Sequence, residues 1–243
     1  MPVSDTKKPL NIYGDRATFV AAGHGADIAS QREDQLDGLA LAEIRRRVAL
    51  RPPLPVKAWD MGCGAGGQAI RMARNGALVT AIDSDPAAGK ALADTIARSE
   101  EAGLARCVDF RCFDIADLAA YDEGLPSPDL ILSQRTIHYF PWDTAVGILS
   151  RWRSLALPGA HLYLSASGLD SELGGPGYAD ADKDVRQRFA RITPALAVKH
   201  GILQPVCLYR EKDMAKLFEA SGWSTLQIFS SPFGNIKAVA LCS

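Results

Sequence analysis

The chain has 243 residues, of which 47% are hydrophobic and 23% are charged. These fractions are those of ordinary globular proteins, so they exclude a disordered chain and a collagen-like repeat. The 27 Lys and Arg residues nearly balance the 28 Asp and Glu residues, which leaves a formal net charge of −1. Because so small a charge exerts no long-range attraction on nucleic acid or an anionic membrane, we expect neither as a partner.

The cysteine pattern and the apolar runs indicate where the protein works. The five cysteines are odd in number and contain no C-x-x-C pair, so we expect neither a disulfide scaffold nor a structural zinc site. The first ten residues lack the apolar run of a secretory signal. No segment approaches the roughly 18 consecutive apolar residues of a membrane-spanning helix. These features predict a soluble, cytoplasmic protein with reduced thiols and no metal site.

Helix-like and strand-like patterns alternate through the first two thirds of the chain. Residues 34–50 predict an amphipathic helix, because Leu36, Ala40 and Ile44 recur at helical spacing and prolines follow. We then expect strands at 56–62, 77–83, 107–113, 129–133 and 161–166, with helices at 67–75, 86–102 and 143–156. Such alternation predicts a parallel sheet covered by helices on both faces.

The last third of the sequence breaks this alternation. Residues 168–209 hold a Gly-Gly-Pro-Gly loop and a charged, helical-looking stretch near 182–192. After a helix at 211–221, strands at 226–230 and 236–241 are joined too closely for a crossover helix, which predicts an antiparallel hairpin. The expected fold class is therefore α/β and Rossmann-like, with a mostly parallel seven-stranded sheet, helices on both faces and an antiparallel C-terminal hairpin.

A glycine-rich string, Ala-Trp-Asp-Met-Gly-Cys-Gly-Ala-Gly-Gly at 58–67, joins the first predicted strand of the sheet to a helix. Glycines at such a turn let a ligand approach the main chain and the free N–H groups of the helix. The pattern G-x-G-x-x-G by itself indicates a dinucleotide site. Asp60 precedes the first glycine, however, and a carboxylate there repels a pyrophosphate and attracts an ammonium group. Asp83, at the end of the next strand, can bind a ribose. It would do so equally in a dinucleotide and in a nucleoside that carries an ammonium group, so it does not distinguish the two kinds of ligand.

These segments resemble the motifs of the class I S-adenosylmethionine-dependent methyltransferases. The glycine string is similar to their first motif and Asp83 to the acid of their second. Residues 113–115 resemble the third-strand segment that meets the adenine, and 129–134 resemble the fourth strand. The resemblance covers about 57–243, apart from 168–209, and implies S-adenosylmethionine as cofactor. The binding residues it implies are Tyr13, Asp60, Gly62, Cys63, Gly64, Gly66, Asp83, Ser84, Asp114, Ile115, Ser133 and Gln134. Asp117 is an alternative to Asp114.

The segment after the fourth strand differs from the Asn-Pro-Pro-Tyr or Asp-Pro-Pro-Tyr string of members that methylate bases or glutamine amides. It looks more like the Leu-His-His loop of small-molecule methyltransferases. His138 is then a candidate general base, or else a structural histidine. Arg135 either binds an acceptor carboxylate or pairs with a surface acid. Tyr139 and Trp142 are candidates for the acceptor pocket, and Trp142 is equally a core candidate.

The resulting functional hypothesis is a methyltransferase that acts on a small-molecule acceptor by in-line displacement and releases S-adenosylhomocysteine. The alternatives are an NAD(P)-dependent oxidoreductase and a non-catalytic module that binds S-adenosylmethionine. Residues 1–55 are predicted to form an arm and helix that cap the site, because 12–16 resemble the N-terminal arm of small-molecule members. Residues 56–243 are predicted to form the methyltransferase domain, with 168–209 as a substrate lid.

Overall fold

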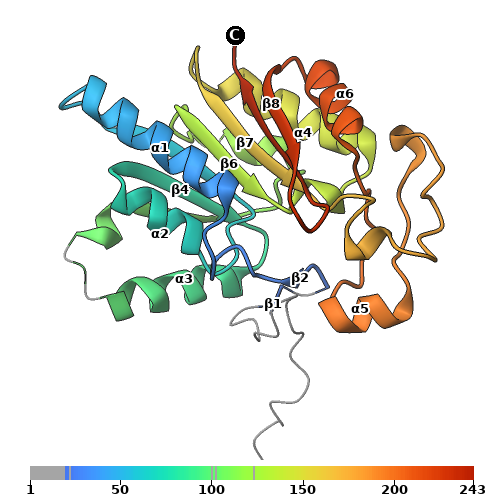
Figure 1. The fold of residues 1–243 in the computed structure, drawn as a ribbon. Helices are drawn as coiled ribbons and strands as arrows, with labels where there is room; N and C mark the ends of the chain where they lie inside the picture. The colour runs from blue at the N-terminus through green and yellow to red at the C-terminus, as the bar shows by residue number, and fades with distance from the viewer. Residues whose placement is uncertain (1–19, 22, 100, 102, 123) are drawn as a thin grey trace, which may run out of the picture.

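A computed structural model describes residues 20–21, 23–99, 101, 103–122 and 124–243 (Figure 1). At its centre lies a seven-stranded sheet. Its strands are β3 (Val56–Met61), β4 (Ala77–Asp83), β5 (Val108–Cys112), β6 (Leu130–Gln134), β7 (His161–Ala166), β8 (Ser224–Ser230) and β9 (Ile236–Leu241). They lie side by side in the order β5-β4-β3-β6-β7-β9-β8. The predicted strands are therefore confirmed, with small differences at their ends.

The direction of the strands divides the sheet into two parts. The five strands β3 to β7 all run parallel to one another. The strand β9 runs antiparallel to both β7 and β8, so the C-terminal hairpin closes one side of the sheet. The Rossmann-like fold class is confirmed, and the carboxyl ends of the parallel strands meet at one edge. In open α/β sheets this edge is where ligands bind.

Helices cover both faces of the sheet (Figure 1). They are α1 (Gln35–Leu50), α2 (Gly67–Arg74), α3 (Pro86–Ser99), α4 (Trp142–Leu155) and α6 (Glu211–Ser221), whereas α5 (Pro194–His200) lies in the insert, apart from the sheet. Alternate side chains of β6 show the division: Leu130 and Leu132 join the core formed with α1, α2 and α3, whereas Ile131 joins the core formed with α4 and α6. This period of two is what a strand buried on both faces requires. Trp142 belongs to the second core, so it packs in the interior.

The insert at 168–209 differs from the prediction. The expected helical stretch at 182–192 contains only a 3₁₀ turn, η6 (Val185–Gln187), and the α-helix of this region is α5. The reason is Arg188, whose buried guanidinium donates to the carbonyls of Leu208 (2.6 Å) and Lys183 (2.7 Å) and to Asp213 (2.8 Å). Because these contacts turn the chain inward, tertiary structure overrides the local helical pattern.

Two short strands, β1 (Val20–Ala21) and β2 (Gly25–Ala26), precede α1 and pair with each other. We call residues 23–34 the strap, because they lead from this hairpin to α1 across the carboxyl edge of the sheet. The strap ends at Asp34, which caps α1 by accepting hydrogen bonds from the N–H groups of Leu36 (2.7 Å) and Asp37 (3.3 Å). Asp34 also forms an ion pair with Lys237 of β9 (2.6 Å), so it joins the strap to the hairpin.

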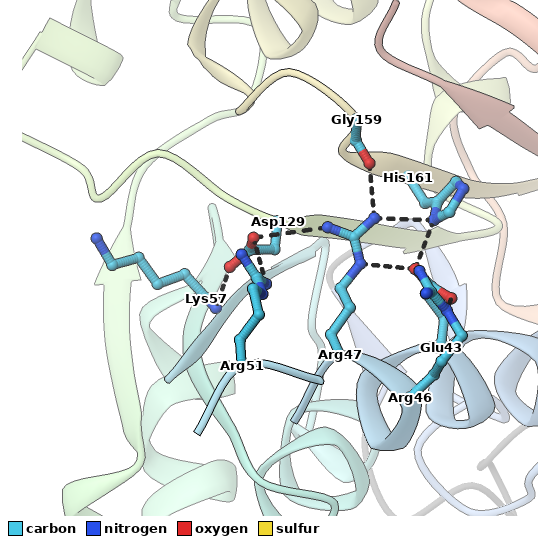
Figure 2. Close-up of polar contacts among 8 residues, drawn as sticks. All are labelled: Glu43, Arg46, Arg47, Arg51, Lys57, Asp129, Gly159 and His161. Atoms are coloured by element: carbon cyan, nitrogen blue, oxygen red, sulfur yellow. Dashed lines mark hydrogen bonds and ion pairs between the residues drawn. The ribbon is translucent and has the colours of Figure 1, made fainter. Parts of the chain in front are cut away.

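The C-terminal half of α1 is fastened to the opposite edge of the sheet, where the parallel strands begin (Figure 2). Arg47 donates to Glu43 (2.6 Å) and to the carbonyl of Gly159 (2.6 Å). Asp129 accepts from Arg51 (2.7 Å) and from the backbone N–H of Lys57 (2.9 Å). Each carboxylate of this network therefore has cationic partners. We call this group the amino-edge network.

None of the helices in the described part of the chain combines the length and the apolar character needed to cross a membrane.

Candidate functional site

A pocket of about 970 Å³ lies at the carboxyl edge of the parallel strands. Its walls come from the strap, the turns that follow β3, β4, β5 and β6, the insert and the turn between β8 and β9. Sites for small molecules and cofactors usually measure roughly 300–1,000 Å³. This pocket lies at the upper end of that range, so it has room for a cofactor and a second small molecule.

The glycine turn after β3 forms part of the pocket wall. Gly62 and Gly64 have φ angles of 77° and 51°, in the left-handed region that favours glycine. Side chains of the protein itself pack against both glycines: a Cβ atom on Gly62 would collide with Thr136, and one on Gly64 would collide with Asp27. The glycines thus let two polar side chains approach the turn closely.

The strap reaches this turn through two side chains that the sequence interpretation did not single out. The Asp27 carboxylate accepts from the N–H groups of Ala65 (2.7 Å) and Ser30 (2.9 Å). The Ser30 hydroxyl accepts from the N–H of Gly67 at the start of α2 (3.0 Å). In addition, Arg71 donates to the carbonyl of Ala29 (2.7 Å). The strap is therefore bound across the N-terminus of α2, and Asp27 lines the pocket.

Asp83 ends β4 with its carboxylate in the pocket wall. One carboxylate oxygen accepts from the N–H of Gly64 (2.9 Å) and the other from the N–H of Asp85 (2.9 Å). Burial raises the pKa of this carboxyl, while the two backbone N–H groups favour its charged form. Each oxygen still has a free lone pair, so the carboxylate is held in one orientation and can accept hydrogen bonds from a ligand.

Asp27, Asp60 and Asp83 form what we call the acid cluster. Asp60 is buried behind the glycine turn, and neither of its carboxylate oxygens has a hydrogen-bond partner among the described residues. Burial, followed by the neighbouring Asp27 charge, raises the pKa of Asp60 to about 8, and the charge of Arg71 and the nearby backbone N–H of Ala69 lower it less. Asp27 also acts to raise the pKa of Asp83. Such a concentration of carboxylates attracts a cationic ligand and repels a pyrophosphate.

The segment after β5 adds one side of the pocket. Both Asp114 and the buried Ile115 line it, next to Ser84 from the end of β4. Asp114 also accepts from the N–H of Ala116 (2.9 Å), which fixes the turn. The alternative acid, Asp117, is exposed and does not line the pocket. The geometry therefore favours Asp114 over Asp117.

The structure brings most of the predicted site residues together, but not all of them. Gly62, Gly64, Asp83, Ser84, Asp114, Ile115, Gln134, Arg135, His138 and Tyr139 line the pocket. Four others lie behind its wall: Asp60, Cys63, Gly66 and Ser133. Gly66 is the N-cap of α2, and the Ser133 hydroxyl donates to the carbonyl of Met61 (2.9 Å). Tyr13 lies outside the described residues.

The turn after β6 carries the candidate acceptor residues. Arg135 has a φ of 53°, and it is the one residue other than glycine with a positive φ in the described ranges. Its backbone N–H donates to the carbonyl of Ser165 on β7 (3.0 Å). A left-handed conformation costs a non-glycine residue roughly 1–2 kcal/mol, and such strain is often found at functional sites.

His138 is buried in the pocket wall, and its ring lies against that of Tyr139, tilted by 39° at a centroid distance of 4.2 Å. Its Nδ1 accepts from the N–H of Ser167 (3.5 Å), and its Nε2 has no partner within the described ranges. Burial, together with the charges of Arg135 and His24, lowers the pKa of His138 to about 3. The imidazole is therefore neutral at physiological pH, with its hydrogen on Nε2.

The insert and the hairpin contribute residues that sequence reasoning did not identify. Glu172 and His200 of the insert line the pocket and contact each other (3.1 Å). The hydroxyl of Tyr139 donates to the carbonyl of His24 in the strap. Lys237 reaches the pocket from β9. Among the described residues, no three His, Cys, Asp or Glu side chains are grouped to hold a metal ion.

Comparison with known proteins identifies the domain that holds this pocket. Residues 59–164 match a family model described as a methyltransferase domain. This range runs from β3 to β7 and includes the glycine turn, Asp83, Asp114 and His138. The chain contains a methyltransferase domain. The resemblance to class I methyltransferases is thereby confirmed for the part of the chain that forms the parallel strands.

Curated relatives agree with this result over a similar length of the chain. A ubiquinone biosynthesis O-methyltransferase of Xanthomonas axonopodis pv. citri (strain 306) is 38% identical over 115 residues, which are 46% of this chain and 44% of that protein. The corresponding protein of Xanthomonas euvesicatoria pv. vesicatoria (strain 85-10) is 40% identical over 108 residues, or 44% and 41% of the two chains. The match spans less than half the length of these relatives.

Solved structures extend the similarity in fold to most of the chain. Burkholderia thailandensis 1,6-didemethyltoxoflavin-N1-methyltransferase, with 1,6-didemethyltoxoflavin and S-adenosylhomocysteine bound, has a TM-score of 0.57 at 19% identity over 86% of this chain and 79% of its own. Magnesium protoporphyrin IX methyltransferase of Synechocystis PCC 6803 with bound SAM has a TM-score of 0.54 at 19% identity, over 96% and 88%. At this identity the likeness establishes the Rossmann-like fold alone.

Proposed function

We propose that this protein transfers a methyl group from S-adenosylmethionine to a small-molecule acceptor. The observation that carries the proposal is the acid cluster at the glycine turn of a methyltransferase domain. S-adenosylmethionine carries an ammonium group and a sulfonium centre, and both are stabilised by nearby carboxylates. The cofactor supplies an activated methyl group, which leaves by in-line displacement so that S-adenosylhomocysteine is released.

The residues of the acid cluster have separate roles in this proposal. Asp83, held by the N–H groups of Gly64 and Asp85, accepts hydrogen bonds from the ribose hydroxyls. The Asp27 carboxylate favours the ammonium group, and the buried Asp60 adds a negative charge when it is deprotonated. Asp114 and Ile115 bind the edge and the face of the adenine, as the family resemblance implies.

The second part of the pocket orients the acceptor. Its side chains come from the turn after β6 and from the insert. With a pKa of about 3, His138 is a weak general base, and its geometry supports a neutral hydrogen-bonding role better than proton abstraction. Alignment of the nucleophile and exclusion of water then supply most of the catalysis, up to roughly 7–11 kcal/mol in ideal cases.

The strap and the insert serve as the cover of the site in this proposal. They touch each other through backbone hydrogen bonds, from Gly25 to the carbonyl of Gly201 (3.1 Å) and from Leu203 to the carbonyl of Gly23 (2.8 Å). Together with Tyr139 they border the acceptor side of the pocket. We therefore expect these segments to select the acceptor, as loops on a rigid scaffold commonly do.

The cysteine pattern supports our prediction that the enzyme works in the cytoplasm.

Calorimetric titration tests the proposal directly. S-adenosylmethionine and S-adenosylhomocysteine should both bind, and NAD and NADP should not, because their pyrophosphate would lie beside the acid cluster. Binding of NAD(P) without binding of either sulfur compound would favour the oxidoreductase alternative. A non-catalytic binding module would bind the cofactor but methylate nothing in a screen of hydroxyl, amine and thiol compounds.

The role of His138 has its own test, because a base and a hydrogen-bond donor respond differently to pH. In the His138→Gln variant, the amide can still donate a hydrogen bond but cannot accept a proton at neutral pH. Turnover that keeps its pH profile would support the donor role. Loss of a pH-dependent limb of the profile would identify His138 as the base.

A further inference from the structure

The starting point is the guanidinium of Arg135. Arg135 lines the pocket, yet no carboxylate or other group in the described part of the chain forms an ion pair or a side-chain hydrogen bond with it. The groups that feel its charge are His138, Tyr139 and His200. None of these three is an acid that would neutralise a guanidinium, so Arg135 contributes an uncompensated positive charge to the wall.

Other cationic side chains of the pocket are engaged by the protein. Lys237 forms an ion pair with Asp34 (2.6 Å), and His200 contacts Glu172 (3.1 Å). Buried and half-buried charges normally have a partner of opposite sign, because desolvation without one is costly. Lys237 and His200 each have a carboxylate partner. The half-buried Arg135 has none among the described residues.

The backbone holds Arg135 firmly at this place. Its N–H donates both to the carbonyl of Ser165 (3.0 Å) and to the hydroxyl of the same residue (3.1 Å). The positive φ of 53° would be relieved by glycine or asparagine, yet the residue present is an arginine. Strain maintained at a pocket-lining residue points to a use for its side chain.

We propose that Arg135 binds a carboxylate of the methyl acceptor, so that the substrate class is a small carboxylic acid with a methylatable group. This inference rests on the proposed function and names the substrate class of the same site. A guanidinium suits a carboxylate because its planar N–H groups donate two parallel hydrogen bonds to the two oxygens. The neighbouring rings of Tyr139 and Phe140 leave room for an apolar body on the acid.

Arg135 could also bind the carboxylate of the cofactor, but its position favours the carboxylate of the acceptor. The cofactor side of the pocket is built from the ends of β3, β4 and β5, whereas Arg135 is bonded to β7, on the other side of β6. Its charge acts on residues of the turn after β6 and on His200 of the insert. These are the segments that border the acceptor side.

Matched pairs of neutral and anionic probes test the proposal. The full-length protein, with and without saturating S-adenosylhomocysteine, is titrated with benzoate and benzamide and with hexanoate and hexanamide. We expect at least one acid to bind about tenfold or more tightly than its amide, which is the preference a bidentate pair supplies. In Arg135→Gln this preference should disappear, and in Arg135→Lys part of it should remain.

Arg106→Gln is the matched control, because Arg106 is exposed and lies outside the pocket. It should keep the preference for the acid. Equal affinity for acid and amide in the wild type, or an unchanged preference in Arg135→Gln, would overturn the proposal. So would a large loss of S-adenosylhomocysteine affinity in Arg135→Gln with the acid preference intact, since Arg135 would then serve the cofactor. Failure of the wild type to bind S-adenosylhomocysteine would instead contradict the proposed function.

Discussion

The two edges of the parallel sheet use the same residue types in opposite ways. At the amino edge, Glu43 and Asp129 are each paired with arginines at distances of 2.6–2.7 Å (Figure 2). At the carboxyl edge, the acid cluster has no arginine bound to its pocket-facing carboxylates, and Asp60 has no hydrogen-bond partner in the described residues. The carboxylates of the amino edge are thus neutralised by arginines of the protein, whereas those of the carboxyl edge can pair with a cationic ligand.

The pKa values follow this contrast. Burial acts to raise the pKa of Glu43, but hydrogen bonds from Arg46 and Arg47 outweigh it and lower the pKa to about 2. Burial and the Asp27 charge raise the pKa of Asp60 to about 8, because the opposing charge of Arg71 is too weak to offset them. Carboxyl groups with shifted pKa values therefore occur at both edges. Such a shift indicates a ligand site only where the carboxyl group has no cationic partner within the protein.

The largest expected effect is the loss of a partner at the amino edge. Arg47→Met should lower the free energy of unfolding by about 3 kcal/mol, because it leaves the buried carboxylate of Glu43 with one arginine and the carbonyl of Gly159 without its donor. Urea denaturation measures this change. Arg45→Met is the control, since Arg45 is exposed and should change the value by less than about 0.5 kcal/mol. Cofactor affinity should be the same in both variants; a loss in Arg47→Met alone would mean that the edges are not independent.

At the carboxyl edge the larger loss should appear in binding. Asp83→Ala removes the acceptor of two backbone N–H groups and of the ribose hydroxyls, so S-adenosylhomocysteine should bind about 100-fold more weakly. Calorimetry gives the affinity, with Asp117→Ala as the control because Asp117 is exposed and outside the pocket. Unchanged affinity in Asp83→Ala would contradict the ribose assignment.

Asp60 tests the contrast through pH. The pKa of Asp60 rises from the ordinary aspartate value of 3.8, which applies to the unfolded chain, to about 8 in the folded protein. The folded state therefore holds the proton more tightly than the unfolded state. Wild-type stability should therefore fall as pH rises between these two values and level off above the higher one. Asp60→Asn should remove this slope and gain about 1–2 kcal/mol at pH 7.

At pH 7, where Asp60 is protonated, the same variant should bind S-adenosylhomocysteine about as tightly as the wild type; above pH 8 it should bind more weakly, because the ammonium group then lacks a nearby negative charge. Thermal denaturation from pH 5 to pH 9 and parallel titrations measure the two effects. A variant that is less stable than the wild type at pH 7 would show that the Asp60 carboxylate is compensated in the folded protein.

The smallest effect concerns the strap. Ser30→Ala removes the acceptor of the Gly67 N–H and should cost about 0.5–1.5 kcal/mol. The loss should be local, with faster hydrogen exchange at Gly67 and across the strap and little change at the amino edge. Ser154→Ala is a suitable control, because Ser154 is exposed and bonds only within its own turn. Uniformly faster exchange in Ser30→Ala would mean that the strap is part of the global folding unit.

The sequence predicted the parts of the molecule that depend on local pattern. The strands of the sheet and the helices α1 to α4 follow from the spacing of apolar residues, and the glycine turn and Asp83 follow from their position at strand ends. These features need only the neighbouring residues to specify them. That is why the fold class, and the presence of the glycine turn and Asp83 at the carboxyl edge of the sheet, are predictable from the sequence.

The remaining features depend on contacts between distant segments. Asp27 bonds to Ala65 and Ser30 to Gly67, and nothing in the local sequence of the strap indicates either partner. Arg188 is drawn into the interior by Asp213, which abolishes a helix that the charged pattern indicated. That Arg135 has no carboxylate partner among the described residues cannot be predicted from sequence either, because it depends on which side chains meet in the folded pocket.

The strap has a consequence for the order of events during turnover. One continuous segment bonds to the glycine turn at Ala65 and Gly67 and, through His24, to Tyr139 on the other side of the pocket. A movement that opens one side therefore disturbs the other. Under the proposed function, we therefore expect the entry and departure of the two ligands to be linked, so that an acceptor that stabilises the seated strap slows the exchange of spent cofactor for fresh cofactor.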